Sequence, residues 1–126
     1  MLKKSLCWAA LICVGAAQAQ WVPVAPAESG VQFFIDPTSI QKTAGMAKVW
    51  ELMNTDKADG EGVRSSRFRV EYDCAGKRSR GLEMLTFGQA MAAGQPLRTM
   101  GPDPDGWEAV PPNSLYAERM KIACTK

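Results

Sequence analysis

The chain has 126 residues, of which 46% are hydrophobic and 22% charged, and its formal net charge is +2. This length is typical of one small domain, and the ordinary composition disfavours the disordered, collagen and coiled-coil classes. Because the chain contains no histidine, Ser-His and Cys-His catalytic pairs and imidazole-ligated metal sites are excluded.

The first nineteen residues have the pattern of a secretory signal peptide. Lys3 and Lys4 precede an apolar run from Leu6 to Ala17, which at about 12 residues is shorter than the ~20 that span a membrane. Ala17-Gln18-Ala19 places small residues at positions minus three and minus one of a cleavage site. We therefore predict cleavage between Ala19 and Gln20, with a signal peptide at residues 1–19, one domain at residues 20–126 and no membrane span.

Removal of the leader changes the charge balance. The 15 Lys and Arg fall to 13 without Lys3 and Lys4, which equals the 13 Asp and Glu. The predicted mature chain is therefore formally neutral, and no nucleic-acid partner is expected.

Two cysteines, Cys74 and Cys124, remain in the predicted domain. In an exported domain, two cysteines permit one pairing, and a disulfide that closes a loop of about fifty residues stabilises by ~4 kcal/mol. The alternatives are a redox thiol or half of a metal site. The chain lacks a CxxC spacing here and has no histidine ligands, so we favour a structural disulfide.

Most of the predicted domain has the pattern of strands bounded by turn residues. In chain order, strands are expected at Trp21 to Val24, Val31 to Ile35, Lys48 to Asn54, Val63 to Cys74, Arg78 to Phe87 and Leu97 to Met100. The first of these is limited by Pro23 and Pro26 to an edge position. Asp36-Pro37-Thr38-Ser39 is expected to end the second strand in a turn.

The segment from Val63 to Cys74 has the clearest alternation. One face is expected to carry Phe68, Val70, Tyr72 and Cys74, and the other Arg67, Arg69, Glu71 and Asp73. This pattern is typical of a half-buried antiparallel strand.

One helix is expected near the C-terminus, capped by Asn113 or Ser114. Its apolar stripe contains Leu115, Tyr116, Met120, Ala123 and Cys124, whereas Glu118, Arg119 and Lys121 are expected to lie elsewhere. Both cysteines then lie on apolar faces. The predicted fold is α+β and mainly β: one antiparallel sheet of about six strands, with a C-terminal helix pinned to its inner face by a disulfide.

A cluster of basic residues lies across the hairpin predicted between residues 63 and 87. The candidate partner-binding patch consists of Arg67, Arg69, Arg78 and Arg80, and its positive charge suits an acidic protein, a glycosaminoglycan or a lipid head group. The alternative is a solvated face whose charge is balanced by Glu71, Asp73 and Glu83.

Other chemistry-bearing residues have simpler interpretations. The acidic turns around Asp59 and Asp103 lack the spacing of a calcium hand, so no metal site is predicted. Trp21, Trp50 and Trp107 are expected to anchor the core, with ligand stacking as the alternative. Gly-x-Ser-x-Gly is absent. We expect no enzymatic activity and no cofactor, although a small hydrolase with an unrecognised carboxylate pair remains a third class.

An ordered series of short motifs resembles the surface-adhesin protein E family of Gram-negative bacteria. The series comprises Phe33-Phe34-Ile35-Asp36 with Ser39-Ile40, Val49-Trp50 with Leu52, Gly62-Val63-Arg64-Ser65, Tyr72-Asp73-Cys74, Met91 to Gly94, Trp107 with Val110-Pro111, and Cys124. The resemblance implies a small antiparallel sheet whose concave face holds a disulfide-tethered C-terminal helix. It also implies binding of host extracellular-matrix or plasma proteins.

The leader departs from this resemblance because it lacks the lipobox of a surface lipoprotein. The expected function is therefore an exported, non-enzymatic binding module that resembles a surface adhesin. The alternative is a soluble periplasmic or envelope-associated protein of the same fold, with a homodimer through an exposed sheet edge as one option. Both alternatives predict a protein partner and a location in the periplasm, at the cell surface or outside the cell.

Overall fold

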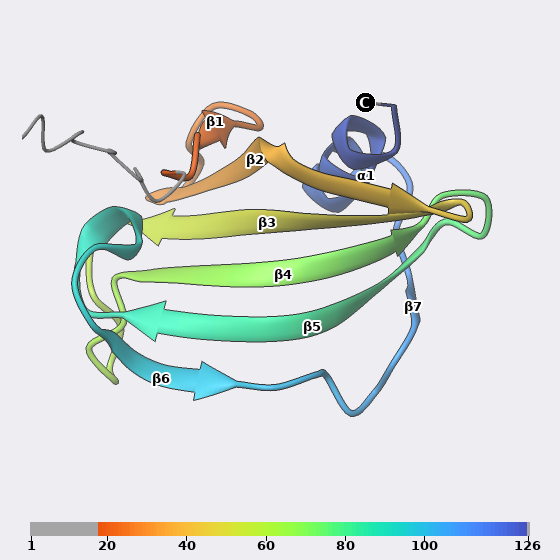
Figure 1. Ribbon diagram of the computed structural model, residues 1–126. Coiled ribbons are helices and arrows are strands. Elements are labelled where there is room, and N and C mark those ends of the chain that lie inside the picture. The colour runs from red at the N-terminus through yellow and green to blue at the C-terminus, as the bar shows by residue number, and fades with distance from the viewer. Residues whose placement is uncertain (1–17, 126) are drawn as a thin grey trace, which may run out of the picture.

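The computed structural model describes residues 18–125 (Figure 1). The predicted cleavage point after Ala19 lies at the start of this range, and residues 1–17 of the predicted signal peptide lie outside it. The signal peptide therefore stays a prediction.

Six strands form an antiparallel sheet in which neighbours in the chain are neighbours in space (Figure 1). They are β1 (Val22–Pro23), β2 (Val31–Thr43), β3 (Met46–Thr55), β4 (Ser65–Asp73), β5 (Arg78–Phe87) and β6 (Pro96–Met100). A short β7 (Glu108–Ala109), which the sequence pattern did not predict, pairs with the start of β5. A 3-10 turn (Ala90–Ala92) and the helix α1 (Leu115–Thr125) complete the fold.

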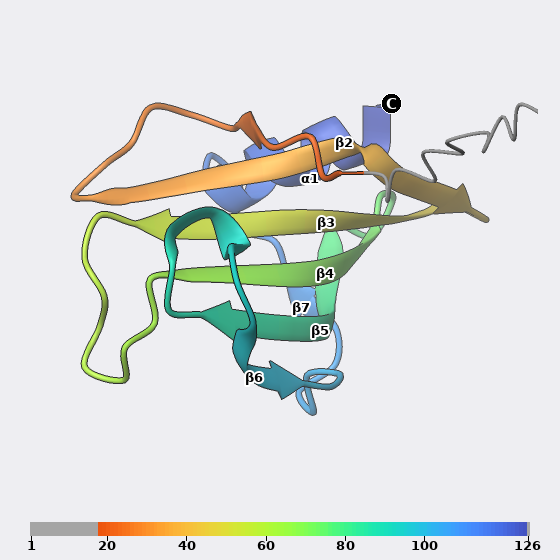
Figure 2. The same ribbon diagram turned by 60° about the vertical axis from the view of Figure 1, so that its left-hand side comes forward.

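The helix α1 packs on one face of the sheet, behind β2 in the view of Figure 1, and Figure 2 shows the same arrangement from the side. We call this face the covered face and the opposite one the open face. The core between sheet and helix is built from Ile35, Ala47, Val49, Val70, Tyr72, Val110 and Ala123. The disulfide Cys74–Cys124, with a Cα–Cα distance of 5.8 Å, links the end of β4 to α1. These features confirm the predicted mainly β fold and its disulfide.

The alternation predicted for β4 is confirmed by its contacts. Val70 and Tyr72 are buried in the core, and Phe68 and Cys74 pack against it. The helix begins where the sequence indicates, because the Ser114 Oγ accepts a hydrogen bond of 3.1 Å from the Ala117 N–H. Ser114 is thus the N-cap.

The turn predicted at residues 36–39 is wrong, because β2 continues through it to Thr43. The register against β3 shifts between Asp36 and Gln41, which marks a β-bulge. Within the bulge, the Trp50 N–H donates to the Ser39 Oγ at 2.9 Å, and Asp36 accepts a hydrogen bond from the Thr38 N–H at 3.0 Å. Side-chain groups replace part of the interrupted backbone ladder, so turn-forming residues are accommodated inside a strand.

Among the residues that the structure describes, no helix is both long enough and apolar enough to cross a membrane.

Candidate binding surface

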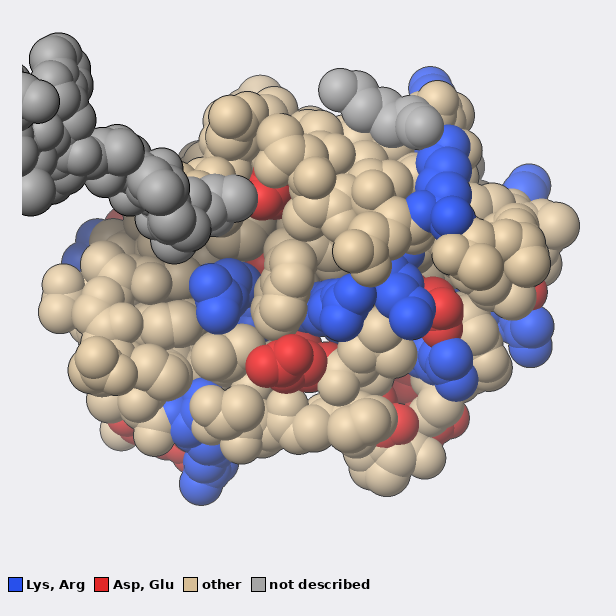
Figure 3. Space-filling view, in the orientation of Figure 1, with Lys and Arg blue, Asp and Glu red and all other residues tan. Residues whose placement is uncertain are grey.

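The four arginines of the predicted patch lie on one face of the sheet, the open face. Arg67 and Arg69 alternate along β4 with the core residues Phe68 and Val70. Arg80 and Arg78 on β5 pair in register with Glu71 and Asp73 of β4. These two acidic residues continue the alternation of Arg67 and Arg69, so their side chains lie on the same face of the sheet. Figure 3 shows basic side chains across the middle of this face, with acidic side chains among them.

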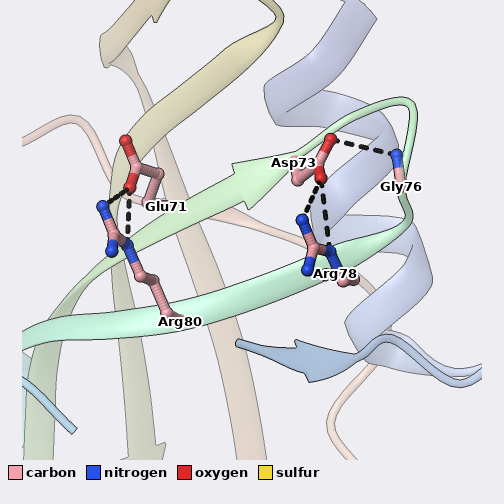
Figure 4. Close-up of polar contacts among 5 residues, drawn as sticks. All are labelled: Glu71, Asp73, Gly76, Arg78 and Arg80. Atoms are coloured by element: carbon pink, nitrogen blue, oxygen red, sulfur yellow. Dashed lines mark hydrogen bonds and ion pairs between the residues drawn. The ribbon is translucent and has the colours of Figure 1, made fainter. Parts of the chain in front are cut away.

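Two of the arginines are paired with carboxylates of the neighbouring strand (Figure 4). Arg80 donates to Glu71 through Nε at 2.7 Å and through Nη2 at 2.5 Å. Arg78 Nη2 lies 2.8 Å from Asp73 Oδ2, and the Gly76 N–H also donates to Asp73. The pKa of the Asp73 carboxyl is therefore lower than its ordinary value. The hydrogen bond from Arg78 is the largest cause, and the one from the Gly76 N–H is the next.

Tryptophan rings lie against the guanidinium groups at both ends of the patch. The Arg80 and Arg78 guanidinium carbons lie 4.6 and 5.2 Å from the centre of the Trp107 ring. At the other end, the Arg67 guanidinium carbon lies 4.9 Å from the Trp50 ring centre. These distances are those of cation–π contacts. Trp21, Trp50 and Trp107 are all half-buried, and none of them belongs to the core cluster, so the predicted core-anchoring role is wrong. Trp50 and Trp107 stack on arginines of the same chain, and ligand stacking stays a prediction.

Arg69 and Arg67 have no carboxylate bonded to them in the described part of the chain. Arg69 Nη2 donates to the Gln41 Oε1 at 3.0 Å, and Glu83 pairs with Arg69 in register. The Arg67 Nε is buried and has no hydrogen-bond partner. The patch is therefore a ladder of mixed charge, with its less neutralised end at Arg67 and Arg69.

A polar pocket of about 320 Å³ opens beside Arg67. The N-terminal segment forms one wall through Gln18, Ala19 and Trp21, and the sheet forms the other through Asp36, Thr38, Ser39, Trp50 and Arg67. The pocket brings Trp21 and Trp50, 29 positions apart in the sequence, to the lining of one site.

The covered face carries a buried charge pair that was not predicted. Arg119, expected outside the apolar stripe of the helix, is 95% buried, and its Nη1 lies 2.8 Å from Glu51 Oε1. This expectation is wrong because position along the helix, and not side-chain polarity, decides which residues face the sheet. Arg119 lies four residues after Leu115 and four before Ala123, so all three share one face of α1. The sequence signal for this pair was the position of Glu51 two residues after the core residue Val49, which puts both side chains on the same face of β3.

Aromatic rings and a phenol complete this buried cluster. The Arg119 guanidinium carbon lies 4.5 Å from the centre of the Phe33 ring and 4.6 Å from that of Tyr116. The Tyr72 hydroxyl donates to Glu51. Burial raises the pKa of the Glu51 carboxyl, opposed by Arg119, and burial beside Glu51 raises the pKa of the Tyr72 hydroxyl. Because the cluster is enclosed by the helix and the sheet, we assign it to stability and not to binding.

The acidic turn around Asp103 brings three carboxylates together. Oxygens of Asp103, Asp105 and Glu108 lie within 4.8 Å of one another, and all three residues are exposed. Exposed acidic groups of this kind are common without an ion, and the ordinary acidic turn expected from the sequence stays a prediction.

Comparisons with known proteins agree with this architecture. The family model for surface-adhesin protein E matches residues 21–125. A structure of selenomethionine protein E from Haemophilus influenzae has a TM-score of 0.58 at 14% identity and covers 86% of this chain and 96% of its own. A crystal structure of protein E from non-typeable Haemophilus influenzae has a TM-score of 0.54 at 19% identity and covers 85% of each chain.

At these identities, the structural similarities show a shared fold. No curated protein matches the chain in sequence at a significant level. The family model, however, extends from the residue before β1 to the last residue of α1, and this match is independent of the structural comparison. The chain therefore belongs to the surface-adhesin protein E family.

Proposed function

We propose that the protein is a non-enzymatic adhesin-like module that binds a host extracellular-matrix or plasma protein through the open face of its sheet. The observation that carries this proposal is the convergence of Arg67, Arg69, Arg78 and Arg80 on that face, with Trp50 and Trp107 against them. Arginine and tryptophan are the residues most enriched where protein interfaces concentrate their binding energy.

The contacts assign different roles within the patch. Arg78 and Arg80 are already bonded to Asp73 and Glu71, so they supply shape and hydrogen-bond geometry more than net charge. Arg69 bonds only a neutral amide in the described chain. We therefore expect Arg69 to supply most of the salt-dependent attraction to an acidic partner.

Charge reversal tests this proposal. The exported chain is applied to surfaces coated with extracellular-matrix extract or plasma proteins, and binding is measured over a range of salt concentrations. Arg69→Glu should weaken binding and flatten its salt dependence. The matched control is Arg98→Glu on β6, which changes the net charge equally at an exposed site outside the patch. Equal loss in both variants, or none in Arg69→Glu, would contradict the proposal.

The family implies an exported or surface-located protein, and we propose the cell surface as the working location. Protease treatment of intact cells, beside a known periplasmic control, tests this. Loss of this protein while the control survives supports the surface. Survival of both until the outer membrane is opened favours the periplasmic alternative with an envelope partner.

A further inference from the structure

The pocket beside Arg67 has an arrangement that suits a small polar ligand. Its sheet wall follows one row across the strands, because Asp36 pairs in register with Trp50. Val22 pairs with Ile35 in an antiparallel arrangement. The residue before Val22, which is Trp21, therefore lies next to the residue after Ile35, which is Asp36, in the same row. Two aromatic side chains therefore flank a carboxylate on the open face.

Arg67, one of the residues that line the pocket, has a hydrogen-bond donor that nothing in the described chain uses. The Arg67 side chain is held by its contact with the Trp50 ring, and its guanidinium carbon also lies 6.0 Å from the centre of the Phe87 ring. This position leaves its Nε buried and without a partner. Most buried donors have partners in native proteins, because an unpaired one loses its bonds to water without replacement.

The same pocket contains a fixed hydrogen-bond acceptor. Asp36 is 95% buried, and its Oδ1 accepts hydrogen bonds from the Thr38 N–H at 3.0 Å and the Thr38 hydroxyl at 2.5 Å. These bonds hold the carboxylate in one orientation. No hydrogen bond among the described residues reaches its Oδ2, which remains available to a ligand.

The charges select the class of ligand. An anion would be attracted by Arg67 but repelled by Asp36, and a cation would meet the reverse. A neutral group that both donates and accepts hydrogen bonds satisfies the two side chains at once. Hydroxyl groups meet this requirement, and the C–H faces of a sugar ring pack well on the flat apolar surface of an indole.

We propose that this pocket binds one neutral sugar residue of a glycan, held between Trp21 and Trp50 and hydrogen-bonded to Asp36 and Arg67. With Gln18 and Ala19 in its wall, the pocket has a volume of about 320 Å³, at the lower end of small-molecule sites. The predicted cleavage after Ala19 removes this part of the wall. In the exported chain the site is then an open groove lined by Trp21, Asp36, Trp50 and Arg67, among others, which suits one sugar residue of a longer glycan.

This inference deepens the proposed function and rests on it for the source of the glycan, a host glycoprotein. Sugar binding itself is measured without any partner protein. The probes are the methyl glycosides of glucose, galactose, mannose and N-acetylglucosamine, with sulfate as the anionic probe. Nuclear magnetic resonance of the exported chain follows the indole N–H signals of its tryptophans.

At least one glycoside should shift the signals of Trp21 and Trp50 saturably, whereas the signal of Trp107 should stay in place because its ring lies at the other end of the patch. Asp36→Asn should weaken glycoside binding about ten-fold, since the amide replaces the charged acceptor. Arg67→Lys keeps the cation but removes the planar guanidinium with its several donors, and it should weaken binding similarly. An unchanged Trp107 signal shows that each variant is folded.

Two results would overturn the inference. One is sulfate binding that shifts the same signals and becomes tighter in Asp36→Asn, which identifies an anion site. The other is the absence of any shift with all four glycosides.

A separate experiment distinguishes this inference from the proposed function. Periodate treatment of the matrix coating, which destroys sugar rings, should abolish binding of the exported chain. Binding that survives periodate but is lost in Arg69→Glu would leave the proposed function standing and contradict the glycan.

Discussion

The two faces of the sheet use the same groups in opposite ways. On the covered face, Arg119 is enclosed with Glu51 and two aromatic rings, and its side chain is 6% exposed. On the open face, Arg80 has a carboxylate and the Trp107 ring as partners, yet its side chain is 42% exposed. An arginine, a carboxylate and an aromatic ring therefore do not define a role by themselves. Solvent access decides whether the set stabilises the fold or remains available to a partner.

The largest effect is expected from breaking the buried set. Arg119→Met leaves the Glu51 carboxylate buried without its cation, which should cost about 3–5 kcal/mol of unfolding free energy. The measurement is urea denaturation. A cost below about 1 kcal/mol, comparable with an exposed pair, would contradict the distinction between the faces.

A multiple variant controls for packing at this position. Glu51→Leu and Tyr72→Phe combined with Arg119→Met remove the ion pair and the hydroxyl that is bonded to Glu51, so no buried charge is left unpaired. Most of the lost stability should return.

The disulfide is the next largest contribution to the covered face. Cys74→Ala with Cys124→Ala should cost ~4 kcal/mol if the loop entropy of the unfolded chain dominates. Denaturation with and without a reductant checks this value in the unmodified protein. The open-face pocket should be unaffected under conditions where the variant is folded, as read from the Trp21 and Trp50 signals.

On the open face, the matched substitution should have a smaller effect on stability. Arg80→Gln removes the bonded pair with Glu71. The Arg80 side chain is 42% exposed but the Glu71 side chain only 7%, so the cost should lie above the roughly 0.2–1 kcal/mol of an exposed pair and below the about 3–5 kcal/mol of a buried one. The contact with Trp107 should also weaken. A cost as large as that of Arg119→Met would mean that the two faces do not differ in the way described.

The smallest effect is expected at Asp73. Its pKa is lowered in the folded protein, so its carboxylate stabilises the fold above the unfolded pKa of about 3.9, and this contribution is lost as the pH falls through the folded value. Asp73→Asn should therefore make the free energy of unfolding slightly less sensitive to pH in the acidic range. Near neutral pH, the variant should be slightly less stable than the unmodified protein. Denaturation midpoints across this pH range provide the measurement.

Much of this arrangement can be predicted from the sequence where local pattern and tertiary environment agree. The alternation from Phe68 to Cys74 predicts both faces of β4, and Ser114 predicts the start of α1, because each depends on neighbours in the chain. The residues 36–39 were misassigned because their preference for turns is also satisfied in a bulge, and pairing with β3 decides between the two. Arg119 was misassigned because its burial depends on Glu51, 68 positions away.

The candidate site divides in the same way. Strand alternation is enough to bring Arg67 and Arg69 to one face, and a single hairpin adds Arg78 and Arg80. The pocket depends on register across three strands and on the path of the segment before β1. Local sequence pattern contains no signal for such a combination, so Asp36 and Trp21 could not be identified as partners in advance.

The position of α1 at the end of the fold has a consequence for the order of assembly. Arg119 and Cys124 follow every strand in the chain, so a chain that emerges with its N-terminus first completes its sheet before either residue arrives. During that interval, Glu51 lacks its cation and Cys74 lacks its partner. Docking of the helix then supplies both in one event. Docking of α1 therefore converts an uncovered sheet into the complete fold, and a chain interrupted before α1 keeps that face of the sheet uncovered.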